Sequence, residues 1–545
     1  MNAVAEAFTP KLITVLREGY GRAELRADLI AGLTVAVVAL PLAMALGIAS
    51  GASPREGLVT AVVAGFLISA LGGSRVQIGG PTGAFVVIVA GVIALHGFNG
   101  LLLATLMAGV ILIIAGYAGV GRLMRYVPMP VVTGFTAGIA VIIASSQVGD
   151  FLGLRAGAAP VDFVDKWGVY LHTLGTTNAA AAGLGAATLA SIVLLRRFLP
   201  RLPAYLIAIV GAAAAAALFN LPVATVGDRF PSMPRGLPLP HLPDFSLGLA
   251  REVMPSAFVI AFLAGIEALL SATVADGMTG RRHRPGQELV GMGVANIFSA
   301  FGGLPATGAI ARTATSIRAG ATSPMAGIFH SLFLLIFILM AGKWLALVPM
   351  AALAAVLLMV AWGMSEYDRF VALVRTDAGE RGVLLLTFML TVFVDLTVAI
   401  GVGVTLAALL FMMRMSETAG LVAVDAAEEP GLRQALPEGV EVFRFTGPLF
   451  FGVASEMLEA LRRTGQRPRA IILRMEGVPY IDATGANALA TFVRQARGSG
   501  TDVWLCGLQH EPREFLARLE PPFADARHVA KWATALKTLK KVSGK

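Results

Sequence analysis

Two kinds of residue are scarce in this chain of 545 residues: charged residues and cysteine. Only 14% of the residues are charged while 56% are hydrophobic, a balance that excludes a soluble protein through most of the length. The single cysteine, Cys506, excludes an internal disulfide and a zinc cluster held by cysteines. The sequence also lacks paired catalytic acids, a Ser/His/Asp series and metal-ligand spacing. We therefore expect no enzyme, no bound metal and no other cofactor.

The basic balance of the chain, +9 at pH 7 with a pI of about 9.9, has two interpretations. One is a nucleic-acid partner, and the other is a set of basic loops on one side of a membrane. The hydrophobic composition favours the second, so we expect membrane lipid around the chain and no nucleic acid. Residues 1–28 are mixed and mildly basic and lack the short apolar core of a cleaved signal. We treat them as an N-terminal segment that precedes the first apolar run, and the distribution of arginines described below predicts that it is cytoplasmic.

Apolar segments recur from residue 29 to residue 415 and predict a membrane all-α domain, since crossing a bilayer takes roughly 20 apolar residues. The first half, 29–219, contains the predicted segments Leu29–Ser50, Leu58–Leu71, Phe85–Leu95, Leu101–Gly119, Val131–Gly149, Ala179–Leu195 and Ala204–Phe219. The second half, 251–413, contains Met254–Thr273, Leu289–Phe301, the interrupted stretch Gly302–Arg318, Met325–Met340, Trp344–Trp362, Val383–Val394 and Leu396–Met413. A proline-rich connection from Pro222 to Pro243 separates the halves.

Each half thus has about seven segments, about 14 in all, and two halves with an odd number of crossings are inverted relative to each other. Arginines support the segment count because they gather on one predicted side. That side receives Arg17, Arg22, Arg26, Arg122, Arg125, Arg196, Arg197, Arg201, Arg281, Arg282, Arg284, Arg369, Arg375, Arg381 and Arg414. The other side receives far fewer, such as Arg55, Arg155 and Lys166. By the positive-inside rule, we expect the N-terminus and the end of the last helix on the cytoplasmic side of a bacterial inner membrane.

Two interrupted segments stand out, GGPTGAF at Gly79–Phe85 and GGLPATGAIARTATSIR at Gly302–Arg318. Both carry Thr-Gly-Ala shortly after a proline, and they occupy corresponding places in the two halves. Such paired interruptions are the best sequence indication of a transporter's binding site. A half-helix that starts after a break points N–H groups and a positive dipole end at the bilayer middle. The second copy adds Arg312, so we predict an anion site near the midplane with Arg312 as its permanent charge.

The composition changes after Met415. Val440–Phe445, Ala470–Met475 and Asp502–Cys506 have the pattern of short strands, and Ala486–Arg497 has helical spacing. Strands that alternate with helices predict a small cytoplasmic α/β domain, which we place at 438–540.

These motifs resemble the SulP sulfate permease and solute-carrier anion transporter family. The matching segments are Ala31–Gly51, GGPTGAF and Ala264–Thr313, and the C-terminal part resembles a STAS domain through Phe445–Ala454 and Val478–Leu489. The resemblance implies an inverted-repeat fold with core and gate subdomains and a cytoplasmic STAS domain. It also implies a homodimer and secondary transport of a small inorganic or carboxylate anion.

The resemblance further implies which residues contact the anion. The facing half-helix ends are Thr82, Gly83, Ala84 and Phe85 in the first half and Gly308, Ala309, Ile310, Ala311 and Arg312 in the second. Close packing of small residues is the alternative account of the same glycines and alanines. Leu42 and Leu46 follow Pro41, where relatives place polar side chains, so this wall of the site is expected to be apolar.

Glu267, inside an apolar segment, is the acidic candidate for coupling, because a buried carboxyl can carry a proton with the anion. The alternative is a structural partner for Arg312. Ile310 stands where sodium-coupled relatives have a cation ligand, and this substitution disfavours sodium. His330 is either a proton relay or a locally bonded histidine, and Asp395 is predicted in a solvated turn.

Thr484, in the turn Asp482-Ala483-Thr484-Gly485, matches the phosphorylated position of soluble STAS relatives. It is a candidate regulatory residue, with helix capping by its hydroxyl as the favoured alternative. For the whole chain we predict proton-coupled symport of an oxyanion, sulfate first, by alternating access. The alternatives are a bicarbonate (sodium-coupled) or dicarboxylate transporter and, in another class, a passive anion channel or a STAS-linked anion sensor.

Overall fold

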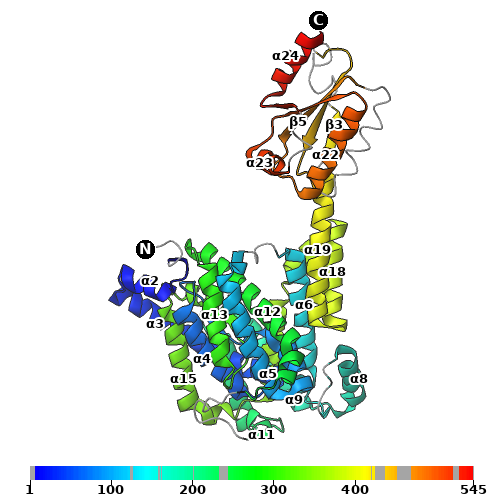
Figure 1. Cartoon of the computed structure of the whole chain (residues 1–545). Coiled ribbons are helices and arrows are strands. Elements are labelled where there is room, and N and C mark those ends of the chain that lie inside the picture. Colours follow the sequence, from blue (N-terminus) through cyan, green and yellow to red (C-terminus); the bar gives the residue numbers. More distant parts are fainter. Residues whose placement is uncertain are drawn as a thin grey trace. The chain divides into compact units, whose positions relative to one another are not determined.

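The computed structural model describes residues 6–122, 127–157, 160, 162–200, 202–231, 243–418, 420–423, 436–450, 468–519 and 527–543. Arg125, Arg201, residues 451–454 of the predicted STAS motif and the prolines between 232 and 242 lie outside these ranges. The chain divides into two compact units, Met1–Val404 and Thr405–Lys545 (Figure 1). Each unit is described by itself.

The first unit is helical. Its first half contains α2 (Lys11–Glu18), α3 (Arg22–Ala49), α4 (Pro54–Leu71), the 3-10 turn η1 (Gly83–Phe85), α5 (Val86–Tyr117), α6 (Met129–Ser146), α7 (Val148–Leu152), α8 (Phe163–Thr173), α9 (Ala179–Phe198), α10 (Ala204–Leu218) and α11 (Val226–Arg229). Its second half contains α12 (Leu247–Thr279), α13 (Pro285–Ser299), α14 (Ile310–Arg318), α15 (Met325–Leu345), α16 (Met350–Met364), α17 (Tyr367–Val374), α18 (Ala378–Phe393) and α19 (Leu396–Thr418), which continues into the second unit.

Within the described residues, eight helices are long and apolar enough to cross a membrane, and two more apolar helices are shorter. The predicted pair Phe85–Leu95 and Leu101–Gly119 corresponds to α5, in which Gly97 has non-helical angles (φ 69°, ψ −179°) that separate two helices. The predicted start of a segment at Trp344 is wrong. Trp344 lies in the last turn of α15, which ends at Leu345, and the next helix begins at Met350 after Pro349, because proline fixes a φ suited to a helix start.

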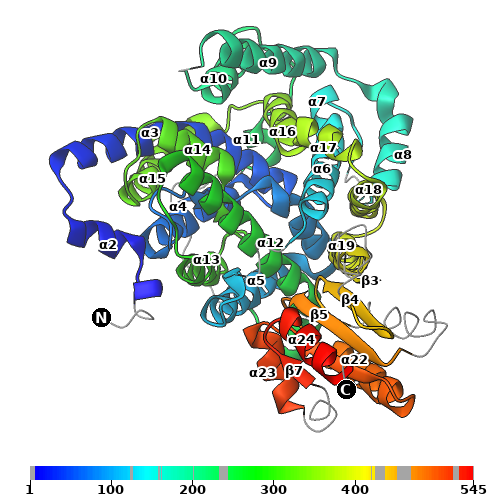
Figure 2. The ribbon, with the colours of Figure 1, turned by 90° about the horizontal axis from the view of Figure 1, so that it is seen from above.

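The helices of the first unit form two packed groups, as Figure 2 shows from above. In one group α3, α4, α5, α12, α13, α14 and α15 contact each other, and in the other α6, α7, α9, α16 and α18 do so. The first group matches a core subdomain and the second a gate. Small residues allow close packing within the core: a Cβ on Gly109 would lie 2.7 Å from the Gly293 carbonyl oxygen, and one on Gly293 would lie 2.5 Å from that of Gly109.

The second unit is built on a sheet with strand order β3-β4-β5-β6-β7. Its strands are β3 (Gly420–Ala423), β4 (Val440–Thr446), β5 (Ala470–Gly477), β6 (Asp502–Cys506) and β7 (Arg527–Val529), and its helices are α22 (Ala483–Gly498), α23 (His510–Arg518) and α24 (Trp532–Ser543). All neighbouring strands are parallel except β3 and β4. Side chains alternate between the two faces, so Phe443 and Leu473 join one hydrophobic cluster while Val442 and Ile472 join the other.

Candidate functional site

The structure brings the two interrupted segments together. Two-residue strands, β1 (Gly79–Gly80) and β2 (Thr307–Gly308), pair antiparallel with Gly79 opposite Gly308. The Ala309 amide also donates to the Ile78 carbonyl at 2.8 Å. Backbone groups that the breaks remove from helices are therefore satisfied by the partner break, which is how irregular backbone is tolerated inside a membrane protein.

A helix begins immediately after each of these strands. The first half-helix starts through η1 into α5 with Thr82 as its N-cap, and α14 starts with Ala309 as its N-cap. Neither N-cap side chain accepts a hydrogen bond from the helix it precedes. Because the first N–H groups of a helix have no partner inside it, both starts present donors and a positive dipole end. Paired helix starts of this kind suit an anion.

Arg312 lies in the first turn of α14, and its side chain reaches across to the other break. It is 4% exposed, and its guanidinium donates to the Gly79 carbonyl at 3.4 Å and to the Pro81 carbonyl. Gly80 makes room for this contact: its φ is +145°, and a Cβ there would lie 2.5 Å from Arg312 Nη1. A guanidinium has five N–H donors, so these two carbonyls leave donors for a bound anion.

Glu267 projects from α12 to the start of the first half-helix. Its Oε2 accepts a hydrogen bond from the Thr82 hydroxyl at 2.9 Å. One turn earlier on the same helix, the Ala264 carbonyl accepts from the Thr307 hydroxyl at 2.8 Å. Helix α12 therefore touches both breaks, and Thr82, not Arg312, is the hydrogen-bond partner of Glu267 in this structure.

The other predicted site residues differ in accessibility. Gly83, Ala84, Phe85, Gly308 and Ala309 are buried, and Thr82 is half-buried. Ile310 and Ala311 are exposed on the first turn of α14, while the following Arg312 is buried. Leu42 is half-buried and Leu46 is buried on α3. This helix continues through Pro41 and packs against α14. The first half-helix start also contacts the gate, since α6 and α16 pack against η1.

Sequence reasoning missed a buried polar side chain beside the second break. The Gln77 amide lies next to Gly308, where a Cβ would come within 1.7 Å of Gln77 Nε2. Within the described part of the chain, neither end of that amide has a hydrogen-bond partner. Buried polar groups in this state are typically satisfied by water. A glutamine directly before an interrupted segment was the available sequence signal.

His330 on α15 is also buried without a hydrogen bond to either ring nitrogen from any described residue. Of the two interpretations of His330, the locally bonded histidine is therefore not found among the described residues. Asp395 lies in an exposed turn, as predicted, where its Oδ1 accepts from Thr397 N at 2.7 Å and Val398 N at 3.3 Å and so caps α19. Among the described residues, no group of three or more His, Cys, Asp or Glu is placed to hold a metal.

The favoured interpretation of Thr484 as a helix cap is wrong as well. Asp482 is the N-cap residue of α22, and its Oδ1 accepts a hydrogen bond from Gly485 N at 2.6 Å. Thr484 is the second residue of the helix and is exposed. A carboxylate two residues earlier satisfies the helix start better than a threonine inside the first turn can, because only the N-cap side chain faces those N–H groups.

These features define a multi-pass membrane protein with a paired-break site in its core and a separate STAS-like α/β unit. The family model described as the sulfate permease family matches residues 25–387, and that of the STAS domain matches 435–521. The chain belongs to the sulfate permease family. The predicted family, the inverted-repeat membrane fold and the STAS domain are confirmed.

Two curated relatives cover almost the whole chain. "Putative sulfate transporter YvdB" of Bacillus subtilis is 39% identical over 505 residues, which span 92% of this chain and 94% of that protein. "Bicarbonate transporter BicA" of a Picosynechococcus strain is 32% identical over 520 residues, 91% of each chain. The relatives are thus named as transporters of two different oxyanions.

Solved structures show the same architecture. The murine Slc26a9 anion transporter in its inward-facing state superposes with a TM-score of 0.84 over 96% of this chain and 92% of its own, and at 19% identity this likeness concerns the fold alone. The transmembrane domain of a cyanobacterial BicA superposes with a TM-score of 0.63 at 31% identity over 70% of this chain and 98% of that domain.

Proposed function

We propose that this chain is a secondary active transporter of an inorganic oxyanion, with sulfate as the first candidate. The observation that carries the proposal is the pairing of two uncapped helix starts with the buried guanidinium of Arg312. A dehydrated anion needs both hydrogen-bond donors and a full positive charge, and this arrangement offers both. YvdB, named for sulfate, is the more similar of the two relatives above, which supports sulfate over bicarbonate as the first substrate to test.

The proposed site comprises the residues at both helix starts, with the apolar wall of Leu42 and Leu46 on α3. It lies between core and gate helices, because the first start contacts α6 and α16 and the second contacts α3. Relative movement of the two groups would expose the site to each side in turn, which is alternating access. The domain boundaries 1–28, 29–415 and 438–540, the cytoplasmic placement of both termini and a homodimer remain part of this proposal.

Glu267 is the proposed coupling group. Its carboxyl accepts a hydrogen bond from the Thr82 hydroxyl at one helix start. A proton gained or lost at Glu267 would therefore change the charge next to the proposed anion site. Sodium coupling is disfavoured by Ile310, because an exposed aliphatic side chain on the first turn of α14 offers no ligand to a cation.

Uptake into proteoliposomes tests the proposal. Purified protein would be reconstituted, and entry of labelled sulfate, bicarbonate and fumarate measured with an inward proton gradient, an inward sodium gradient or neither. A coupled sulfate carrier accumulates sulfate above the outside concentration only with the proton gradient. A channel would equilibrate the anion without accumulating it, and a sensor would transport nothing; either result contradicts the proposal. Arg312→Ala vesicles control for leakage.

A further inference from the structure

Helix α2 lies at the edge of the helical unit and exposes an apolar face. Figure 1 shows it beside the start of α3, outside the packed helices, and the view from above in Figure 2 agrees. Val15 faces the protein and is 5% exposed, whereas Ile13 is 39% and Leu16 55% exposed. Residues three apart on a helix share a face, so Ile13 and Leu16 form one apolar patch that the described residues leave uncovered.

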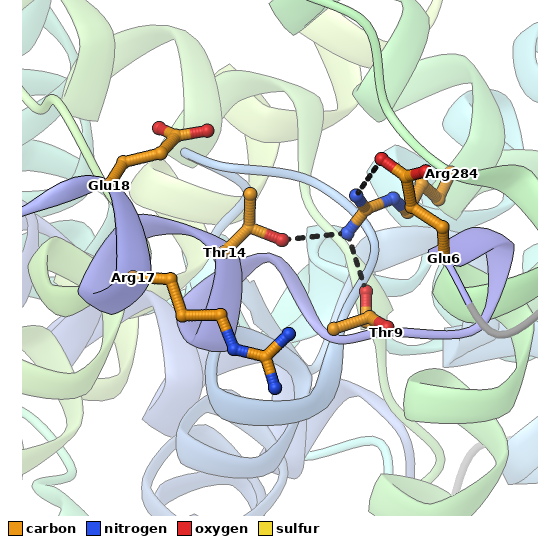
Figure 3. A pocket seen from close by; sticks show the side chains of 6 residues that line it. All are labelled: Glu6, Thr9, Thr14, Arg17, Glu18 and Arg284. Atoms are coloured by element: carbon orange, nitrogen blue, oxygen red, sulfur yellow. Dashed lines mark hydrogen bonds and ion pairs between the residues drawn. The ribbon is translucent and has the colours of Figure 1, made fainter. Parts of the chain in front are cut away.

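The helix is docked in a defined position. Its first amide, Lys11 N, donates to the Gly72 carbonyl at the end of α4 at 3.0 Å. The guanidinium of Arg284, at the start of α13, donates to the Thr9 carbonyl and to the Thr14 hydroxyl, both at 2.8 Å (Figure 3). At the other end of the helix, Glu18 pairs with Arg75. The exposed face of α2 is therefore held outward by contacts on its opposite side.

The neighbouring surface is a membrane surface. Helix α3 follows α2 after a short connection and is one of the candidate spans, with exposed apolar side chains from its first turns onward. These are Leu25, Leu29, Ile30 and Leu33. Since a spanning helix exposes such side chains to lipid, the short connection from α2 to α3 brings the Ile13–Leu16 patch close to the end of a candidate span.

Exposed cationic side chains lie on the same helix as this patch and on the helix that follows it. Arg17, Arg22 and Arg26 are all exposed, on α2 and on the first turns of α3. Arg17 and Arg284 also line a pocket of about 220 Å³ with Thr9, Thr14, Glu6 and Glu18 (Figure 3). Both acids already face a cation, because Glu18 pairs with Arg75 and Glu6 lies 3.9 Å from Arg284.

The pKa of Lys11 is lowered from its ordinary value. Burial is the main cause that lowers the pKa of Lys11, and the nearby charges of Arg284 and Arg75 lower it further. A negatively charged group beside α2 would relieve this repulsion. Exposed apolar side chains next to a candidate membrane span, with arginines on the same and the following helix, are typical of a surface that attracts anionic lipid.

We propose that α2 is an interfacial helix that binds an anionic phospholipid, with Ile13 and Leu16 against the acyl chains and Arg17, Arg22 and Arg26 around the headgroup phosphate. The lipid site is separate from the paired-break anion site and does not depend on which anion is transported. It gives the N-terminal segment a role in anchoring the core helices that it contacts, α4 and α13, to the membrane surface.

A binding measurement tests the headgroup contacts. Thermal unfolding of the full chain in detergent would be followed with added phosphatidylglycerol, phosphatidylcholine or inorganic phosphate. Phosphatidylglycerol should stabilise the wild type, and the double variant Arg17→Gln, Arg22→Gln should weaken its affinity about thirtyfold. The matched control, Arg196→Gln with Arg197→Gln at the end of α9, should keep the wild-type affinity. Equal stabilisation by phosphatidylcholine or by inorganic phosphate, or equal loss in the control, would overturn the proposal.

A depth measurement tests the apolar contacts independently. Cys506 is the single native cysteine, so Cys506→Ala provides a background for one spin label at a time. Labels at Ile13→Cys and Leu16→Cys in proteoliposomes should collide with oxygen, as a label at the lipid-facing Leu33→Cys does. A label at the exposed Ser499→Cys supplies the aqueous reference. If the α2 labels instead collide with a water-soluble nickel complex as Ser499→Cys does, the helix does not lie in the interface.

Discussion

Two helix starts, one in each unit of this protein, differ in whether a side chain accepts hydrogen bonds from the first N–H groups of the helix. Helix α22 begins after Asp482, whose carboxylate accepts from its first turn at 2.6 Å. Helix α14 begins after Ala309, which has no side-chain acceptor, although the sequence around both starts combines Thr, Gly and Ala. The start of α22 is capped by its own side chain, whereas the start of α14 has no side-chain cap.

This difference supports the proposed position of the anion site. A helix start without a side-chain cap is costly inside a membrane, so two paired uncapped starts support the proposed anion as their acceptor. Arg312 strengthens this conclusion because it adds a full charge at the same place. Half-helix dipoles contribute only about 0.3–2 kcal/mol each, whereas dehydrating a full charge costs several kcal/mol even after relaxation.

The largest expected effect comes from removing that charge. Arg312→Ala should weaken anion binding by about a hundredfold or more, since the dipoles alone cannot offset dehydration. Arg312→Lys should retain part of the affinity, because the charge survives while the planar fork does not. Isothermal calorimetry with sulfate on folded, monodisperse protein measures both. Wild-type affinity in Arg312→Ala would refute the proposed site.

A second change gives the start of α14 the kind of cap that α22 has. Ala309→Asp places a carboxylate at the N-cap of α14, where it would accept from the first turn and repel a bound anion. We expect about tenfold weaker sulfate binding. Ala309→Asn, which caps without charge, should fall between Asp and the wild type. If Asn and Asp behave alike, the helix start contributes geometry but no electrostatic attraction.

Glu267→Gln tests coupling at the first helix start. If the carboxyl carries the proton, the variant should bind sulfate normally and exchange it for sulfate, yet fail to accumulate it under an inward proton gradient. Thr82→Val removes the hydrogen-bond partner of Glu267 but leaves the carboxyl, so it should retain accumulation at a reduced rate. Normal accumulation by Glu267→Gln would move the coupling role to another residue.

The reverse experiment removes the N-cap side chain of α22. Asp482→Ala should destabilise the STAS unit by about 1 kcal/mol, the usual value of an N-cap. Cys506 reports it: the thiol is buried, and burial, the largest cause, raises its pKa to about 12, so it reacts with iodoacetamide only when the unit opens. Alkylation should therefore speed up about fivefold, while sulfate affinity stays unchanged. A fall in affinity would mean that the two helix starts are not independent.

The smallest expected effect on stability comes from Thr484→Glu. An acidic side chain in the first turn of α22 is favourable by about 0.3–1 kcal/mol, so the STAS unit should not be destabilised. If Thr484 is regulatory, as we propose, the exposed negative charge should alter the transport rate in proteoliposomes with the sulfate affinity preserved. Thr484→Val serves as the uncharged control. Identical rates in all three proteins would remove the regulatory role.

Composition and spacing were sufficient for much of this protein. Long apolar runs need no partner to be recognised, since crossing a bilayer constrains length and polarity within a single segment. The two breaks were identifiable for the same reason, because Gly, Pro and Thr interrupt those runs locally. Arg312 is recognisable as a charge in an apolar setting. The STAS strands are recognisable as short runs after residue 415, alternating at Val440–Phe445 and continuously apolar at Ala470–Met475.

Boundaries and caps were harder to predict because they depend on competition between neighbouring residues. Trp344 belongs chemically to either flanking segment, and only the helix start after Pro349 assigns it to α15. Thr484 and Asp482 are both capable caps, and the register of α22 selects Asp482.

The sequence alone therefore determined the membrane class, the two halves, the paired breaks and the charge that one of them carries, because each is a local property of the chain. Only the tertiary structure decided that Gly79 pairs with Gly308, that Arg312 donates to carbonyls of the opposite break, and that Gln77 and His330 are buried near the same core without partners among the described residues. These contacts join residues far apart in the chain, and they follow from how the two inverted halves pack, which no spacing within either half encodes.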